Sequence, residues 1–429
     1  MREPAAMTSL AGAIPSMLPF IGTLLSFALL PGLAPRLWHR RMVSITLSWV
    51  VLGLVLTAVR AGPVAALGGL WVATVGDFLP FIAILMALYT LGGGVLIAGG
   101  PWGRPGGNVL LLAIGTVLAG VMGTIGAALL LIHPLLAANG ARRERRHLVL
   151  AFIILVANAG GALSPLGDPP LLIGFLRGVP FFWPTLHLAW PMLVIAVPVL
   201  ALTYGIDRRL AAREPVAKSE RLHLRGGLNI ALLILFVGAI TLSGLVPGPM
   251  LAVGPARLPA AQVALTLLAA IVTLISERST AASIRARNRF AWAPMVEIAV
   301  LFFAIFATIP PVLHLLQTAP LGRNPALWFW LAGLCSAFLD SAPTYLMFFQ
   351  AAGGDAARLI IPPARLLTAI SAGSVFFGAV TYLGNAPNLM IRAIAARRGV
   401  RMPGFFGYCA AAGLVLAPLL IVQTILFFI

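Results

Sequence analysis

The sequence predicts an all-α polytopic membrane protein with about ten full spans and two re-entrant hairpins. Of the 429 residues, 60% are apolar and only 9% are charged, which lies outside the range of soluble domains. Several charge-free runs exceed the roughly 20 residues that a spanning helix needs. Two apolar runs contain clusters of Gly, Pro, Asn and Asp, which predict broken helices.

The basic residues indicate how the spans are threaded. Most of the 29 Lys and Arg residues lie in short segments between apolar runs, which argues for topology signals and against a nucleic-acid surface. Positive-inside reasoning places these segments in the cytoplasm: 35–41, 101–106, 142–146, 207–226, 277–290 and 392–401.

This placement predicts both chain ends outside and the following full spans: 14–34, 43–60, 77–99, 147–177, 184–206, 227–247, 259–276, 294–316, 364–391 and 403–429. The apolar segments 107–138 and 325–351 must each begin and end on one side of the membrane, so we expect re-entrant hairpins there.

The spans group into five predicted regions. Residues 1–76 form N-terminal scaffold spans, and 207–226 form a cytoplasmic linker. Residues 227–293 form linking spans. The two remaining regions are repeats: 77–206, with hairpin 107–138 and broken helix 147–177, and 294–429, with hairpin 325–351 and broken helix 364–391.

The repeat rests on paired motifs. "SPLGDPP" from Ser164 matches "TYLGNAP" from Thr381, 217 residues later, and Thr124 in the first hairpin pairs with Thr344 in the second at an offset of 220. Asp77 and Glu297, each near a predicted span start, also differ by 220. From the span at Asp77 up to the span at Glu297 there are five full crossings, an odd number, so we expect the two units to have opposite orientations. Inverted repeats with discontinuous helices are typical of secondary transporters, whose sites lie where the breaks meet.

The breaks are therefore the predicted site. Unpaired backbone groups cost several kcal/mol each in hydrocarbon, so a broken helix persists only around a wet cavity or a bound ion. Asp168 lies in the first break and Asp340 at the second hairpin tip, although an Asp before Pro also forms turns. Asp77 and Glu297 are candidates for gating or proton-linked roles, with interfacial helix capping as the equal alternative.

Uncharged side chains with oxygen atoms lie beside these acids and are suited to bind Na⁺ or a carboxyl group. Each could instead form a hydrogen bond to a backbone group between packed helices. The predicted substrate or ion ligands are Thr124, Asn158, Ser164, Gly167, Asp168, Asp340, Thr344, Thr381, Gly384, Asn385 and Asn388. No histidine in an apolar segment has a second ligand at metal spacing, so we expect no transition metal. No nucleotide-binding fingerprint or nucleophile motif is present, so we expect neither a cofactor nor an enzyme.

Four motifs resemble the ion transporter superfamily: "GTIGAALLLIHPLL", "NAGGALSPLGDPP", "FLDSAPTYL" and "YLGNAPNLMIRAIA". Within it, the sequence is most similar to bacterial sodium/proton antiporters or citrate transporters (CitMHS-like). The resemblance implies a scaffold domain, a transport domain, a homodimer and the bacterial inner membrane. It also implies two cation sites, one with Thr124 and residues 158–168, the other with Asp340, Thr344 and residues 381–388.

The sequence indicates the transported species less directly than it indicates the position of the site. The core offers carboxylates and amides but no Lys or Arg clearly at membrane depth, which favours Na⁺/H⁺ antiport by alternating access, because burial lets a carboxyl exchange a proton for Na⁺. The alternative is cation-coupled symport of citrate or a related di- or tricarboxylate, with Arg392 as a candidate anion partner. A third alternative is a channel-like or purely structural membrane protein.

Overall fold

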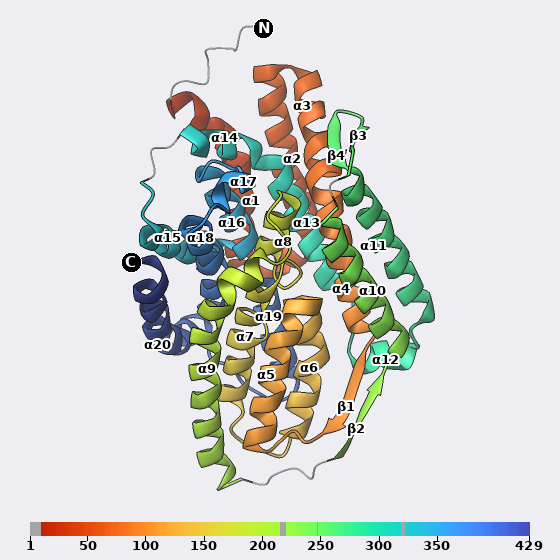
Figure 1. Ribbon diagram of the computed structural model, residues 1–429, viewed down its shortest axis with the longest axis vertical. Helices are drawn as coiled ribbons and strands as arrows, with labels where there is room; N and C mark the ends of the chain where they lie inside the picture. Colours follow the sequence, from red (N-terminus) through yellow and green to blue (C-terminus); the bar gives the residue numbers. More distant parts are fainter. Residues whose placement is uncertain (1–9, 215–219, 247, 319–321) are drawn as a thin grey trace.

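Helices make up nearly all of the regular structure (Figure 1). The structure, a computed structural model, describes residues 10–214, 220–246, 248–318 and 322–429. The first half contains α1 (Leu10–Leu33), α2 (Pro35–Ala61), α3 (Pro63–Trp71), the π-helix η2 (Val72–Phe78), α4 (Leu79–Gly93), β1 (Leu96–Gly100), α5 (Pro105–Met122), α6 (Thr124–Ala138), α7 (Arg146–Leu155), the 3-10 helix η3 (Ala159–Leu163), α8 (Pro169–Leu176), α9 (Trp183–Ala211) and β2 (Glu220–Arg225).

The second half is also helical apart from one short hairpin of strands. It contains α10 (Gly227–Ser243), β3 (Met250–Val253), β4 (Ala256–Pro259), α11 (Ala260–Ser279), α12 (Ala282–Arg287), α13 (Ala293–Thr308), α14 (Pro310–Thr318), α15 (Pro325–Leu339), α16 (Ser341–Ala351), α17 (Ala356–Leu359), α18 (Arg365–Phe376), the 3-10 helix η4 (Phe377–Ala379), α19 (Ala386–Arg397), α20 (Phe405–Gln423) and the π-helix η5 (Thr424–Phe428).

The apolar helices confirm an all-α polytopic membrane protein. By length and composition, seven helices of the described ranges can cross a membrane, or eight if α13 and α14, which meet at a 54° bend, form one span. About ten full spans, two of them broken, were expected. The difference arises because the predicted spans 14–34, 227–247 and 364–391 correspond to shorter apolar helices, whereas Pro105–Met122, part of the predicted hairpin 107–138, is long enough to be counted.

The predicted start of a span at Asp77 is wrong. Helix runs without a gap from Pro63 to Gly93, and Asp77 lies inside it, in η2. The carboxylate of Asp77 forms an ion pair with Arg177 at the end of α8, at 3.0 Å. This partner offsets the charge, so the acid does not have to mark a helix end. The same helix ends at Gly93 rather than continuing to 99, because β1 begins at Leu96.

The predicted linker 207–226 contains regular structure on both of its sides. Helix α9 extends to Ala211, and β2 pairs with β1 as an antiparallel ribbon in which Leu96 faces Arg225 and Ala98 faces His223. Residues 215–219 lie outside the described residues. The expectation failed because a pairing between strands more than 100 residues apart leaves no local signal in the sequence.

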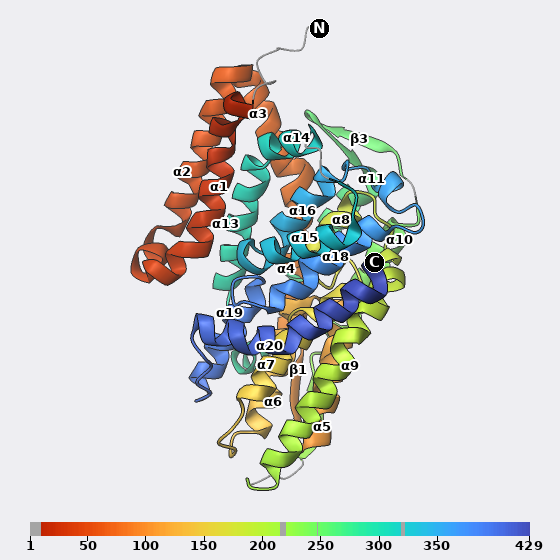
Figure 2. The same cartoon turned by 90° about the vertical axis from the view of Figure 1, so that its left-hand side faces the viewer.

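The helices form layers whose contacts cross between the two halves of the chain. Helices α1, α2 and α3 lie together at one side, against α13 (Figure 2). Helix α5 packs on α6, and α15 packs on α16 and α18. Helix α8, after the first break, packs on α16, and α19, after the second break, packs on α6 and α7. Each broken helix therefore contacts the helical pair of the other half, and this arrangement brings the two breaks together.

Candidate functional site

Two interruptions without regular α-helix set the position of the site. The first extends from the end of α7 at Leu155 to Pro169, and the second from the end of α18 at Phe376 to Ala386, each with a short 3-10 turn. Pro169 and Pro170 lack backbone N–H groups and favour the first turn of a helix. The Pro and Gly residues therefore end one helix and start the next at fixed points.

Asp168 is the last residue of the first interruption, directly before α8, and is buried, with 1% of its surface exposed. Its Oδ1 accepts hydrogen bonds from the Thr124 hydroxyl at 3.2 Å and from Asn385 Nδ2 at 2.9 Å. Its Oδ2 is buried without a hydrogen-bond partner. A buried carboxylate oxygen with no partner is costly, so this oxygen is the natural place for a cation or a proton.

Three asparagines join the two interruptions. Asn158 Nδ2 donates to Asn388 Oδ1 at 2.9 Å, and Asn385 Nδ2 lies 3.3 Å from Asn158 Oδ1. Asn388 Nδ2 donates to the carbonyl oxygens of Gly378 and Thr381, at 2.8 and 2.9 Å. All three side chains are buried. The Asn388 amide thus hydrogen-bonds to backbone carbonyl oxygens of the second break, and the Asn385 amide connects this break to Asp168 in the first.

Ser164 and Thr381 make the same contacts at corresponding places. The Ser164 hydroxyl donates to the Gly120 carbonyl, and the Thr381 hydroxyl donates to the Ala337 carbonyl. Each hydroxyl oxygen also accepts from the backbone N–H two residues later, at 3.0 Å. These hydroxyls hold each break against its neighbouring helix pair, so their geometry is that of positioning residues.

The turns between the paired helices correspond as well. Gly123 between α5 and α6 has φ 82° and ψ 150°, and Asp340 between α15 and α16 has φ 78° and ψ 148°. This conformation suits glycine and strains a residue with a Cβ. Asp340 Oδ1 accepts from the Ala342 N–H at 3.1 Å. Asp340 therefore occupies a turn conformation in which a glycine would fit without strain.

The threonines of the helix pairs have different roles. Thr124 bonds to Asp168, whereas the Thr344 hydroxyl donates to the Asp340 carbonyl at 2.8 Å within its own turn. At the offset of 217 that relates the breaks, Ser341 rather than Thr344 corresponds to Thr124. The Ser341 side chain is fully buried directly beside Asp340, so Ser341 is a site candidate that the sequence interpretation missed.

Gly167 and Gly384 allow the chain to approach itself closely. A Cβ on Gly167 would lie 2.2 Å from the Gly161 carbonyl oxygen, and a Cβ on Gly384 would lie 2.7 Å from the Gly378 carbonyl oxygen. Both distances are well below van der Waals contact. Their observed role is therefore to let each break fold back on itself, which places Asp168 and Asn385 side by side.

We expect Gly167→Ala to lower the yield of folded protein, because the new methyl group must displace the backbone. Overpacking of this kind costs about 1–3 kcal/mol or more. The measurement is the monodisperse fraction after detergent extraction, together with the thermal unfolding midpoint. Gly413→Ala in α20 is the matched control, since a Cβ there meets no atom within 4 Å. Equal behaviour of the two variants would contradict the assigned role.

Among the described residues, neither Asp77 nor Glu297 forms a hydrogen bond or an ion pair with Asp168 or with the side chains that bond to it. Asp77 pairs with Arg177, and Glu297, in α13, accepts a hydrogen bond from Trp38 Nε1 at 3.5 Å. Each of these contacts joins different helices. The structure thus separates the gating candidates from the ligand candidates.

A second buried charge cluster was not predicted. Asp207 near the end of α9 is fully buried and bonds to Arg142 at 2.7 Å, to His147 at 2.9 Å and to Asn108 Nδ2 at 2.9 Å. Asn139 Nδ2 donates to Asn108 Oδ1 at 2.8 Å. These residues belong to α5, α7, α9 and the segment after α6. The cluster ties together the helix ends on one side of the break region.

Comparison with known families decides between a transporter and a channel-like or purely structural membrane protein. Residues 10–428 match a family model described as "Putative citrate transport". The chain belongs to this citrate-transport family. The match covers both breaks and both helix pairs, and it makes the protein a membrane transporter, with a small carboxylate as the substrate class that fits the family. No curated protein matches the chain.

Proposed function

We propose that the protein transports citrate or a related di- or tricarboxylate, coupled to a cation that binds at the helix breaks. The observation that carries the proposal is the unpartnered Oδ2 of buried Asp168, between two broken helices. Carboxylate, hydroxyl and amide oxygens, which Thr124 and the asparagines supply, are ligands suited to Na⁺. The family match supports the carboxylate as the co-transported species.

The same region offers positive ends for an anion. Helix α8 begins directly after Asp168, and α19 begins directly after Asn385. Helix N-termini favour negative charge, and half-helices of transporters use them for substrate carboxylates. Arg392 in α19 is half-buried, with its guanidinium carbon 4.6 Å from the centre of the Tyr382 ring. We propose it as the anion's charged partner.

Na⁺/H⁺ antiport is the second candidate, because acids rather than bases surround the break. Asp340 is close enough to Asp168 for the two carboxylates to repel each other when both are ionised. Among the described residues, no Lys or Arg side chain hydrogen-bonds to Asp168. A cation or a proton would relieve this repulsion, and competition between them is sufficient for exchange.

We also propose that residues 77–206 and 294–429 are inverted repeats that form one transport unit. The support is the shared offset of 217 residues between Gly123 and Asp340, between Ser164 and Thr381, and between Asp168 and Asn385. Each pair lies at the same place in a turn or break. An inverted repeat allows alternating access around a fixed site.

The deciding experiment reconstitutes the purified protein in liposomes that contain a pH-sensitive dye. An inward Na⁺ gradient is imposed with and without external citrate, and uptake of labelled citrate is measured in parallel. Citrate uptake that depends on Na⁺ or on a proton gradient supports the first proposal. Proton efflux driven by Na⁺ alone, unchanged by citrate, would replace it with antiport. Flux that neither saturates nor responds to a counter-ion would overturn both.

Asp340→Gly is expected to keep the fold and to lose coupled transport. Glycine adopts the φ of 78° without strain, which offsets the loss of the hydrogen bond from Ala342. We therefore expect a thermal midpoint equal to or above that of the unchanged protein, with flux in liposomes reduced about tenfold or more, the equivalent of one charge-assisted contact. Normal coupled flux in this variant would show that Asp340 serves only the turn.

A further inference from the structure

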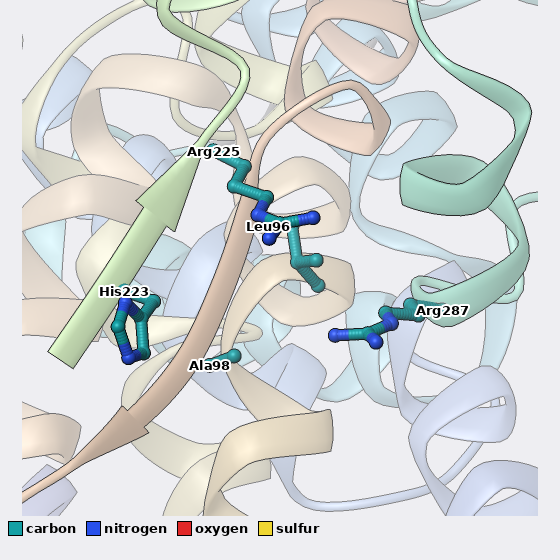
Figure 3. Close-up of a pocket in the computed structure, with 5 residues that line it drawn as sticks. All are labelled: Leu96, Ala98, His223, Arg225 and Arg287. Carbon is teal, nitrogen blue, oxygen red and sulfur yellow. The ribbon is translucent and has the colours of Figure 1, made fainter. Parts of the chain in front are cut away.

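A basic pocket lies away from the breaks, between the β1–β2 ribbon and α12. It has a volume of about 120 Å³ and is lined by Leu96, Ala98, His223, Arg225 and Arg287. Figure 3 shows that the guanidinium groups of Arg225 and Arg287 point from two different elements toward the same space, beside Leu96. The volume corresponds to about four water molecules, enough for a phosphate-sized group.

The two arginines are not neutralised within the protein. Among the side chains that the structure describes, neither Arg225 nor Arg287 forms an ion pair with an acid. The nearby Glu277 pairs instead with Arg285, at 2.7 Å. Two guanidinium groups that converge without an acidic partner repel each other, so the pocket is complementary to an anion.

Buried amides hold the pocket in shape. Asn288, directly after α12, donates to the carbonyl oxygens of Gly93 and Val95 at the end of α4, at 2.9 and 2.6 Å. Asn229 in α10 donates to the Gly94 carbonyl at 3.1 Å. These bonds fix the end of α4, the start of α10 and the end of α12 against one another. The arginines therefore project from a rigid base rather than from a loose loop.

The pocket lies where apolar helices end. Leu96 follows α4 by three residues, Arg225 precedes α10 by two, and α12 follows α11 after a two-residue connection. Helices α4 and α11 belong to candidate membrane spans, and α10 is a shorter apolar helix. Span ends lie at the membrane–water interface, so the pocket is at headgroup depth.

The β2 strand has the pattern of an interfacial segment. Leu222 and Leu224 are 56% and 59% exposed, and they alternate along the strand with His223 and Arg225. Because successive side chains of a strand point to opposite faces, the leucines lie on one face and the basic groups on the other. Acyl chains suit the first face, and phosphate groups suit the second.

We propose that this pocket binds the phosphate headgroup of an anionic phospholipid, with Arg225 and Arg287 as the two charged contacts and the exposed leucines beside the acyl chains. The inference is independent of the transported substrate. It requires only that the ribbon and α12 face the lipid interface.

The test is native mass spectrometry of the purified full-length protein in detergent, titrated with phosphatidylglycerol or with phosphatidylcholine of the same acyl chains. We expect the first phosphatidylglycerol molecule to bind the protein more tightly than the first phosphatidylcholine molecule. Each arginine near a membrane surface contributes about a fivefold change in affinity, so Arg225→Gln with Arg287→Gln should weaken that binding by about 25-fold. Phosphatidylcholine binding should not change.

Matched variants separate a built pocket from general surface charge. Arg209→Gln with Arg278→Gln removes the same charge from exposed positions outside the pocket and should change binding less than twofold. Arg225→Lys with Arg287→Lys keeps the charge and should retain most of the affinity. An equal loss in the control pair would overturn the proposal. So would the absence of a preference for phosphatidylglycerol, or its displacement by inorganic phosphate or citrate at constant ionic strength.

Discussion

Asp168→Asn is expected to abolish coupled transport while leaving the protein folded. Asparagine keeps an Oδ1 that can accept from Thr124 and Asn385, so the contacts at 3.2 and 2.9 Å can persist. The variant loses the negative charge, and it places an amide N–H₂ where the unpartnered Oδ2 now lies. A charge-assisted contact of about 3 kcal/mol corresponds to roughly 100-fold in ion affinity.

The measurement is ion-driven flux in liposomes, with protein incorporation and the thermal midpoint measured on the same sample. Asp355→Asn is the matched control, because Asp355 is exposed, caps α17 through the Ala357 N–H, and can be replaced by Asn as a cap. We expect normal flux for the control. Full activity of Asp168→Asn would remove the carboxylate from the mechanism under both proposed functions.

Asp207→Ala is expected to produce the largest loss of stability. The substitution leaves Arg142 buried with no carboxylate at 2.7 Å, and it removes acceptors from His147 and Asn108. Breaking a buried pair from one side costs about 3–5 kcal/mol. Glu214 is a weaker second partner of Arg142, at 3.5 Å, and should recover only part of that loss.

Thermal unfolding in detergent measures the effect as a lower midpoint. Arg358→Ala is the control, because it breaks an exposed pair with Asp355 at 3.1 Å, and such pairs are worth at most about 1 kcal/mol. We expect a small shift for the control and a large one for Asp207→Ala. Similar shifts for both variants would mean that the buried cluster contributes no more than a surface ion pair.

Local chemistry explains which parts of the fold were predictable. Glycine and proline act on the backbone near their own position, so "SPLGDPP" and "TYLGNAP" located both breaks, and the helix pairs followed from apolar runs. Asp77 was misplaced because an acid in an apolar run resembles a helix end. Its partner, Arg177, lies 100 residues later and only the folded chain brings the two together.

The site, too, was predictable where the signal is local and not where it depends on contacts between distant residues. The residues in the breaks could be predicted from their residue types, and the repeat suggested that Asp168 and Asn385 correspond. Their direct hydrogen bond could not be predicted, because it depends on the packing of α8 on α16 and of α19 on α6 and α7. The cluster around Asp207 has no sequence signal, since its members come from four separate segments. Ser341 was missed because a threonine three residues later resembled the expected ligand.

The pairing of β1 with β2 also affects how the chain is connected. Leu96, the first residue of β1, pairs with Arg225, the last residue of β2. The chain between the two strands therefore starts and ends at the same ribbon (Figure 1). The segment that carries the first helix pair and the first break is thus a loop whose two ends are held together by a hydrogen-bonded, two-stranded stem. Its two ends are already adjacent, which is the condition under which a segment can be inserted into, or removed from, a host fold with little additional loop-closure entropy. The rest of the chain, from α1 to α4 and from α10 onward, is in this sense the host.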